Sequence, residues 1–102
     1  MDNSTIRHTV VFRLRHETGS DEEVSFLTAA ADLKDIPGVD NFEVLNQVGK
    51  KNNFTYGLSM EFANMDAYEG YNNHPQHVDF VENRWIPEVE DFLEIDYTNK
   101  EL

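Results

Sequence analysis

The sequence predicts an α+β fold in which two helices cover one face of a four-stranded antiparallel sheet. Three observations lead to this prediction. Residues 6–14 and 54–62 alternate apolar with polar side chains, which is the period of a β-strand. A capping pattern at Ser20–Glu23 opens a helix between those two segments. A second helical region is interrupted at His74–Pro75 and precedes a final alternating segment.

The first strand is identified by its apolar face. Every second residue of the segment falls on this face, which consists of Ile6, His8, Val10, Phe12 and Leu14. His8 is the polar member of the set, so its side chain is expected to point toward the core. After this strand, the Ser20 cap begins a helix whose apolar residues recur at helical spacing and which ends before Pro37–Gly38.

Two further strands form a predicted hairpin. In residues 39–48 apolar side chains alternate with polar ones, and turn-forming residues follow at Gly49–Asn53. The next strand has a very clean apolar face, made of Phe54, Tyr56, Leu58, Met60 and Phe62. Tyr56 is therefore expected on the core side of the sheet.

The last third of the chain predicts two helical pieces and a strand. Asn64 caps a helix, which breaks at His74 because Pro75 lacks an N–H and disfavours helical backbone in the residue before it. A second piece then runs up to Pro87, and alternation over residues 92–97 predicts the fourth strand. The sum is a ferredoxin-like β-α-β-β-α-β fold with a four-stranded antiparallel sheet.

The predicted fold leaves the second face of the sheet without helices. This face carries a mixed set of side chains: Thr9, Val11, Thr55, Gly57, Ser59 and Glu61. Because two-fold symmetric homodimers are the commonest oligomers, we expect a second copy of the chain to cover it.

Length and charge restrict the partners of the protein. The 102 residues are enough for one domain, predicted to span 1–102 with a core over about 5–98. A net charge of −12 with only eight Lys and Arg residues argues against nucleic acid. An acidic run near the C-terminus is expected to form a solvated face; it contains Glu88, Glu90, Asp91 and Glu94.

Two absences in the sequence limit the location and the chemistry of the protein. No apolar run approaches the length of a membrane span, so a cytoplasmic protein without membrane contact is expected. The lack of Cys excludes disulfides, thiolate catalysis and Cys-based metal sites.

The segment Tyr71–Phe80 carries the residues best suited to chemistry. It places a phenol and two of the four imidazoles within seven residues, and a pocket that holds both groups can polarise a carbonyl while accepting a proton. The other interpretation is a plain helix junction, with Tyr71 in the core and His77 capping the next helix. His74 and His77 have a spacing seen in zinc sites, but no Cys or obvious carboxylate completes a ligand set, so no metal is predicted.

Several segments together carry a resemblance to a known family. They are Ile6–Phe12, Phe54–Phe62, Tyr71–Val78 with its His-Pro-x-His element, and Asp96–Tyr97. In these segments the chain resembles the stress-responsive dimeric α/β-barrel proteins, the Dabb family. The resemblance implies a ferredoxin-like protomer whose sheet pairs with a second copy to form a dimeric α+β barrel, with a pocket between sheet and helices.

The resemblance also implies roles for single residues. In the plant polyketide-cyclase branch of the family, a Tyr and a His that match Tyr71 and His77 carry an intramolecular aldol condensation. Two further His residues of that branch match His8 and His74, whereas its third-strand His is replaced by Tyr56. By this comparison His77 is the general base, Tyr71 donates a hydrogen bond to the developing oxyanion, and His8 and Tyr56 polarise the pocket.

Two function classes follow for this chain. The first is a cofactor-free cyclase, isomerase or lyase acting on a carbonyl compound in a small-molecule pocket. Its acid-base cluster and apolar lining are Tyr71, His74, His77 and His8, with Phe12, Leu58, Met60 and Phe80. The second is a non-catalytic dimeric stress-response protein that binds an apolar ligand or a protein partner, in which the same polar groups are bonded to one another in the core. An open cavity favours the first class, and a filled core favours the second.

A third class comes from related dimeric barrels that act as cofactor-free monooxygenases or degrade haem. Haem would need an open slot with a His ligand and a bulky aromatic, for which Trp85 is the only tryptophan. The spacing of the residues gives no support for this class, and no cofactor is predicted.

Overall fold

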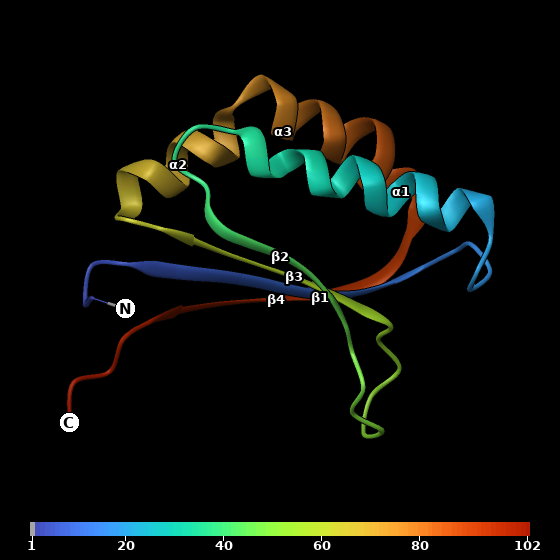
Figure 1. The fold of residues 1–102 in the computed structure, drawn as a ribbon, viewed down its shortest axis with the longest axis horizontal. Coiled ribbons are helices and arrows are strands. Elements are labelled where there is room, and N and C mark those ends of the chain that lie inside the picture. The colour runs from blue at the N-terminus through green and yellow to red at the C-terminus, as the bar shows by residue number, and fades with distance from the viewer. Residues whose placement is uncertain (1) are drawn as a thin grey trace.

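The helices cover one face of a four-stranded antiparallel sheet with strand order β2-β3-β1-β4 (Figure 1). The computed structural model describes residues 2–102. Its elements are β1 (Ile6–Leu14), α1 (Asp21–Ala31), the 3₁₀ turn η1 (Asp32–Asp35), β2 (Asp40–Asn46), β3 (Tyr56–Phe62), α2 (Met65–Asn73), α3 (Pro75–Phe80), the π-helical turn η2 (Val81–Trp85), α4 (Ile86–Glu88) and β4 (Val89–Thr98). The predicted ferredoxin-like order of strands and helices is confirmed.

The register of the central strand β1 decides which residues share the helix-facing side. His8 lies opposite Met60 of β3 and opposite Asp96 of β4. Val10 of β1 lies opposite Glu94 of β4. Because directly opposed residues project to the same face of a sheet, all of these side chains point toward the helices.

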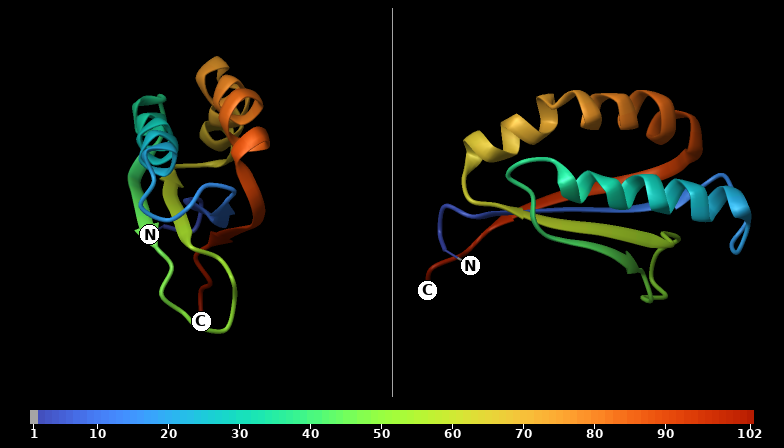
Figure 2. Two further views of the ribbon diagram at one scale, coloured as in Figure 1. Left: turned by 90° about the vertical axis from the view of Figure 1, so that its right-hand side faces the viewer. Right: turned by 45° about the horizontal axis from the view of Figure 1, so that its top comes forward.

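The other face of the sheet has no helix over it, as the two views of Figure 2 show. Three apolar or aromatic side chains of β4 lie on this face with exposed fractions of 50%, 41% and 49%: Leu93, Ile95 and Tyr97. They adjoin Val11 and Thr9 of β1 through the same register. This open face therefore exposes a row of apolar groups that an isolated domain would leave in contact with water.

Helix α1 begins as the capping pattern predicts. The Ser20 hydroxyl accepts a hydrogen bond from the Glu23 N–H, and the Glu23 carboxylate accepts one from the Gly19 N–H. The second carboxylate oxygen of Glu23 accepts a hydrogen bond from the Tyr56 hydroxyl of β3. The cap therefore also ties the start of the helix to the sheet.

The second helical region breaks where it was predicted to break, but it ends later. His74 is extended, with φ −65° and ψ 135°, and Pro75 opens α3. The region then continues through η2 and past Pro87, because Pro87 stands in the first turn of α4, where its missing N–H needs no helical partner. The fourth strand begins at Val89 rather than at residue 92, since a β-bulge beside Leu14 extends the pairing.

The core lies between the sheet and the helices. Its largest fully buried side chains are Phe12, Phe26, Phe62, Ile36 and Met60. Phe26 of α1 joins the two layers, with its ring 5.8 Å from that of Phe12 and 5.4 Å from that of Phe80. Within residues 2–102, no helix combines the length and the apolar character needed to cross a bilayer.

Candidate active site

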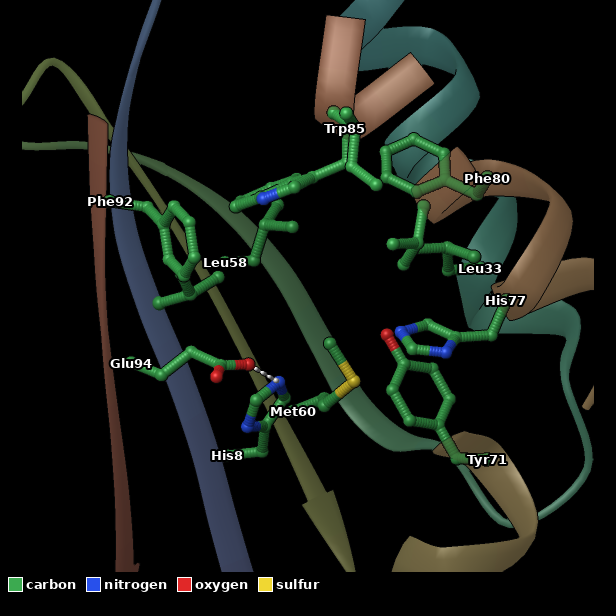
Figure 3. Close-up of a pocket in the computed structure, with 13 residues that line it drawn as sticks. His8, Leu33, Leu58, Met60, Tyr71, His77, Phe80, Trp85, Phe92 and Glu94 are labelled. Carbon is green, nitrogen blue, oxygen red and sulfur yellow. Dashed lines mark ion pairs between the residues drawn. The ribbon is translucent and has the colours of Figure 1, made fainter. Parts of the chain in front are cut away.

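A cavity of about 360 Å³ lies between the helix-facing side of the sheet and the helical region that follows β3 (Figure 3). This volume is at the small end of the range for small-molecule pockets. The cavity is lined by His8, Val10, Leu33, Leu58, Met60, Tyr71, His77, Phe80, Val81, Trp85, Ile86, Phe92 and Glu94. It is an apolar chamber into which only a few polar groups project.

The helix break at Pro75 brings Tyr71 and His77 together. Tyr71 stands near the end of α2 and His77 in α3, so the chain turns between them. Their ring centroids are 4.3 Å apart at an interplanar angle of 42°. Both side chains lie on the same side of the cavity (Figure 3).

The His77 ring is held as a neutral imidazole that can accept a proton. Its Nδ1–H donates a hydrogen bond to the Asn72 carbonyl oxygen at 3.1 Å. A carbonyl oxygen only accepts, so Nδ1 carries the proton and Nε2 keeps its lone pair. Burial lowers the pKa of His77, and the nearby His8 lowers it further, although the Asn72 bond and Glu94 oppose this change. His77 is therefore uncharged at neutral pH.

The Tyr71 hydroxyl is a proton donor that stays protonated. The residue is 2% exposed, and burial, assisted by the charge of Glu94, raises its pKa well above 10. This hydroxyl reaches the cavity beside the His77 ring, and no hydrogen bond from residues 2–102 contributes to its raised pKa. It is free to donate to a ligand.

The His8 ring is oriented by two side chains, Asp96 of β4 and Tyr68 of α2. Its Nδ1–H donates to the Asp96 carboxylate at 2.5 Å, and the Tyr68 hydroxyl donates to the second Asp96 oxygen at 2.7 Å. The Tyr68 oxygen also lies 3.0 Å from His8 Nδ1. This arrangement fixes the ring and turns Nε2 toward the cavity, where Glu94 Oε1 is 3.9 Å away.

Glu94 is exposed, as expected for a solvated acidic run, and it also lies in the cavity lining. Its position opposite Val10 puts its side chain on the helix-facing side of β4. Glu88 departs from the expectation of a solvated run: its side chain is 16% exposed, and its carboxylate accepts a hydrogen bond from Arg84 at 2.5 Å and pairs with His16 Nε2 at 2.7 Å. These bonds lower the pKa of Glu88 against the opposing effect of burial.

The structure brings most of the predicted site residues together and places three elsewhere. The cavity is lined by six of them: Tyr71, His77, His8, Leu58, Met60 and Phe80. Tyr56 is bonded to Glu23, and burial with this contact raises its pKa to about 12. His74 caps α3 through Nδ1, which accepts from the Gln76 N–H. Phe12 is fully buried beside Phe26. Tyr56, His74 and Phe12 therefore do not line the cavity.

The sequence prediction also missed residues of the site. Trp85, Phe92 and Glu94 line the cavity, while Asp96 and Tyr68 hold His8. One signal was available, because Phe92, Glu94 and Asp96 alternate along the last strand and must share a face. Nothing in residues 2–102 gathers three metal-ligating side chains at one point.

Comparison with known proteins places this architecture in a family. Residues 6–99 match the family described as the Stress responsive A/B Barrel Domain, Dabb. The chain belongs to this family. No curated protein matches it significantly in sequence.

Three solved structures illustrate the likeness. A Dabb family protein with a ferredoxin-like fold from Mesorhizobium loti is 53% identical, with a TM-score of 0.94 over 95% of this chain and 98% of the other. The hydroxynitrile lyase of Passiflora edulis is 16% identical, with a TM-score of 0.85 over 99% and 98%. A dimeric ferredoxin-like protein of unknown function from Thermobifida fusca is 22% identical, with a TM-score of 0.77 over 93% and 91%. The last two show a shared fold.

Proposed function

We propose that this protein is a cofactor-free enzyme that moves a proton on a small carbonyl compound, as a cyclase, isomerase or lyase does. One observation carries the proposal: a neutral imidazole and a protonated phenol stand side by side on one wall of an open apolar cavity. A filled core would have favoured the structural interpretation of these residues. A fold shared with a hydroxynitrile lyase supports a catalytic role without specifying the reaction.

The proposed chemistry begins with the ligand carbonyl oxygen accepting a hydrogen bond from the Tyr71 hydroxyl. His77 Nε2 then takes a proton from the carbon next to the carbonyl, and the C–H electron pair becomes the enolate π-bond. Negative charge develops on the oxygen, where the Tyr71 hydrogen bond strengthens. In a cyclase the enolate carbon then attacks a second carbonyl, and the His77 imidazolium gives its proton to the alkoxide that forms. In an isomerase the imidazolium instead returns its proton to another carbon of a conjugated enolate.

We also propose that the working protein is a homodimer joined through the open face of the sheet. The half-exposed row of Leu93, Ile95 and Tyr97 supports this proposal, since a monomer would leave it in water. The dimeric state of the Thermobifida fusca protein of the same fold is consistent with it. Pairing of two sheets by a two-fold axis would form the central barrel for which the family is named.

The proposed proton transfer is tested with para-acetylbiphenyl in deuterated buffer, by following exchange of its methyl protons with nuclear magnetic resonance. We expect the wild-type protein to accelerate exchange. The variants Tyr71→Phe and His77→Asn should each lower the acceleration by about 10²-fold or more, as loss of an oxyanion donor or a general base does. His16→Gln, which alters an imidazole outside the cavity, serves as the control.

Two results would contradict the catalytic proposal. Acceleration that persists in both Tyr71→Phe and His77→Asn would remove these residues from the chemistry. Tight binding of the ketone by the wild-type protein with exchange no faster than in buffer would instead identify a non-catalytic binding protein.

A further inference from the structure

Glu94 is the one acidic residue among the side chains that line the cavity, and no Lys or Arg is among them. Its side chain is 58% exposed, and its carboxylate lies 3.9 Å from His8 Nε2. Figure 3 shows Glu94 and His8 on one side of the cavity and Tyr71 and His77 on the opposite side. The two sides differ in chemistry and lie close together, because the His8 and Tyr71 ring centroids are 6.2 Å apart.

We propose that Glu94 is the specificity-determining residue of this cavity. It rejects ligands that carry a carboxylate or phosphate and accepts a hydrogen bond from a hydroxyl or ammonium group on the side of the ligand that meets Glu94. The inference rests on the proposed function, because it assumes that the carbonyl meets Tyr71 and His77.

The charges around His8 favour this selection. His8 lies between two carboxylates, with Asp96 Oδ1 at 2.5 Å from Nδ1 and Glu94 Oε1 at 3.9 Å from Nε2. Even when the imidazole is protonated, one positive and two negative charges leave this end of the cavity negative. His77 adds no compensating charge, because burial lowers its pKa and keeps it neutral.

The field of Glu94 also reaches the opposite wall. Its charge contributes to the raised pKa of Tyr71 and opposes the lowered pKa of His77. An anionic ligand group near Glu94 would meet repulsion, which water reduces because the Glu94 side chain is 58% exposed. A hydroxyl or ammonium group at the same point would instead donate a hydrogen bond to the carboxylate.

The test measures binding of three acetophenones by calorimetry, with a hydroxyl, an aminomethyl or a carboxylate group at the para position. We expect the wild-type protein to bind the carboxylate compound about tenfold more weakly than the hydroxyl compound, the size of effect that like charges produce at a partly exposed site. Glu94→Gln should remove most of this difference, and Glu94→Lys should reverse the order. Glu22→Gln removes an equal charge from the exposed start of α1 and should leave the wild-type order unchanged.

The outcomes separate this inference from the proposed function. Equal binding of the three compounds by the wild-type protein, with methyl-proton exchange still accelerated, would overturn the role of Glu94 and leave the proposed function standing. The same preference in wild type and Glu94→Gln would also overturn it. Binding of none of the compounds by wild type or by either Glu94 variant would overturn the proposed function and this inference together. Thermal unfolding of each variant confirms that the compared proteins are folded.

Discussion

At the scale of single residues, the two imidazoles of the cavity are prepared for different tasks. His77 donates its Nδ1–H to a backbone carbonyl and is kept neutral by burial, which leaves Nε2 as an acceptor. His8 donates its Nδ1–H to the Asp96 carboxylate, which stabilises the orientation of its ring and turns Nε2 toward the cavity. Neighbouring groups therefore distinguish two chemically identical side chains.

The proposed base predicts the pH dependence of methyl-proton exchange. Only neutral His77 accepts a proton, so the rate constant should rise with pH through the pKa of His77. Because burial lowers that pKa, the midpoint should lie below the usual 6.5. The rate constant should not fall near pH 9, because the pKa of Tyr71 is raised well above 10 and its hydroxyl stays protonated. A rate profile measured between about pH 4 and 9 checks this, and a midpoint at or above the usual histidine value would contradict the assignment.

A second residue-scale prediction concerns Asp96 as a positioning residue. Asp96→Asn keeps the shape of the side chain but offers His8 an amide that can present either a donor or an acceptor. We expect ketone binding to weaken by about threefold to tenfold, because His8 loses its fixed orientation and its charge-assisted bond. The chemical shifts of the His8 ring nitrogens should change as well. Unchanged nitrogen shifts and unchanged binding would show that Asp96 does not orient the ring.

At the scale of elements, the site depends on how one helical region is interrupted. Pro75 breaks the helix between α2 and α3, and this break turns His77 back toward Tyr71. The π-helical turn η2 then shifts the following residues, and Trp85 lines the cavity as a result. A continuous straight helix could not direct both groups of side chains into one chamber.

The contact between α1 and β3 yields a stability prediction. Tyr56→Phe leaves the Glu23 carboxylate, which is 8% exposed, without one of its hydrogen-bond donors. We expect unfolding free energy in urea to fall by about 1–3 kcal/mol, the cost of removing one partner of a buried polar pair. In a double-mutant cycle, Tyr56→Phe should cost less when Glu23→Gln is already present. Strictly additive effects would show that the two groups are not coupled.

At the scale of the whole molecule, one face of the sheet supports the site and the other is available for assembly. The helix-facing side carries His8, Glu94 and Asp96, whereas the next residues along each strand form the open face. Alternation along β4 therefore assigns Glu94 to the cavity and Ile95 to the surface between two copies in the proposed dimer.

The proposed dimer is tested by placing a charge on that surface. Ile95→Lys should shift the protein to the monomer in sedimentation equilibrium, because a buried unpaired ammonium group opposes association. Val78→Lys on α3 is a matched control, since Val78 is 40% exposed and Ile95 is 41% exposed in one protomer. A wild-type protein that sediments as a monomer, or an Ile95→Lys variant that remains dimeric, would contradict this interface.

The sequence by itself determined the order of strands and helices, the helix cap at Ser20 and the break at Pro75. These features depend on local periodicity and on hydrogen bonds between near neighbours, so they are visible without a fold. The proximity of Tyr71 and His77 belongs with them, because the two residues flank one corner of the chain.

Only the tertiary structure decided the rest of the site. His8 and Asp96 are 88 positions apart, and their bond depends on the register between β1 and β4. The same register directs Glu94 into the cavity. Tyr56 faces the helices as well, but its hydroxyl bonds to Glu23 instead of reaching the cavity. A strand pattern tells which side of the sheet a residue faces, but the packing of helices over that side decides whether it meets a cavity, a carboxylate or a filled core.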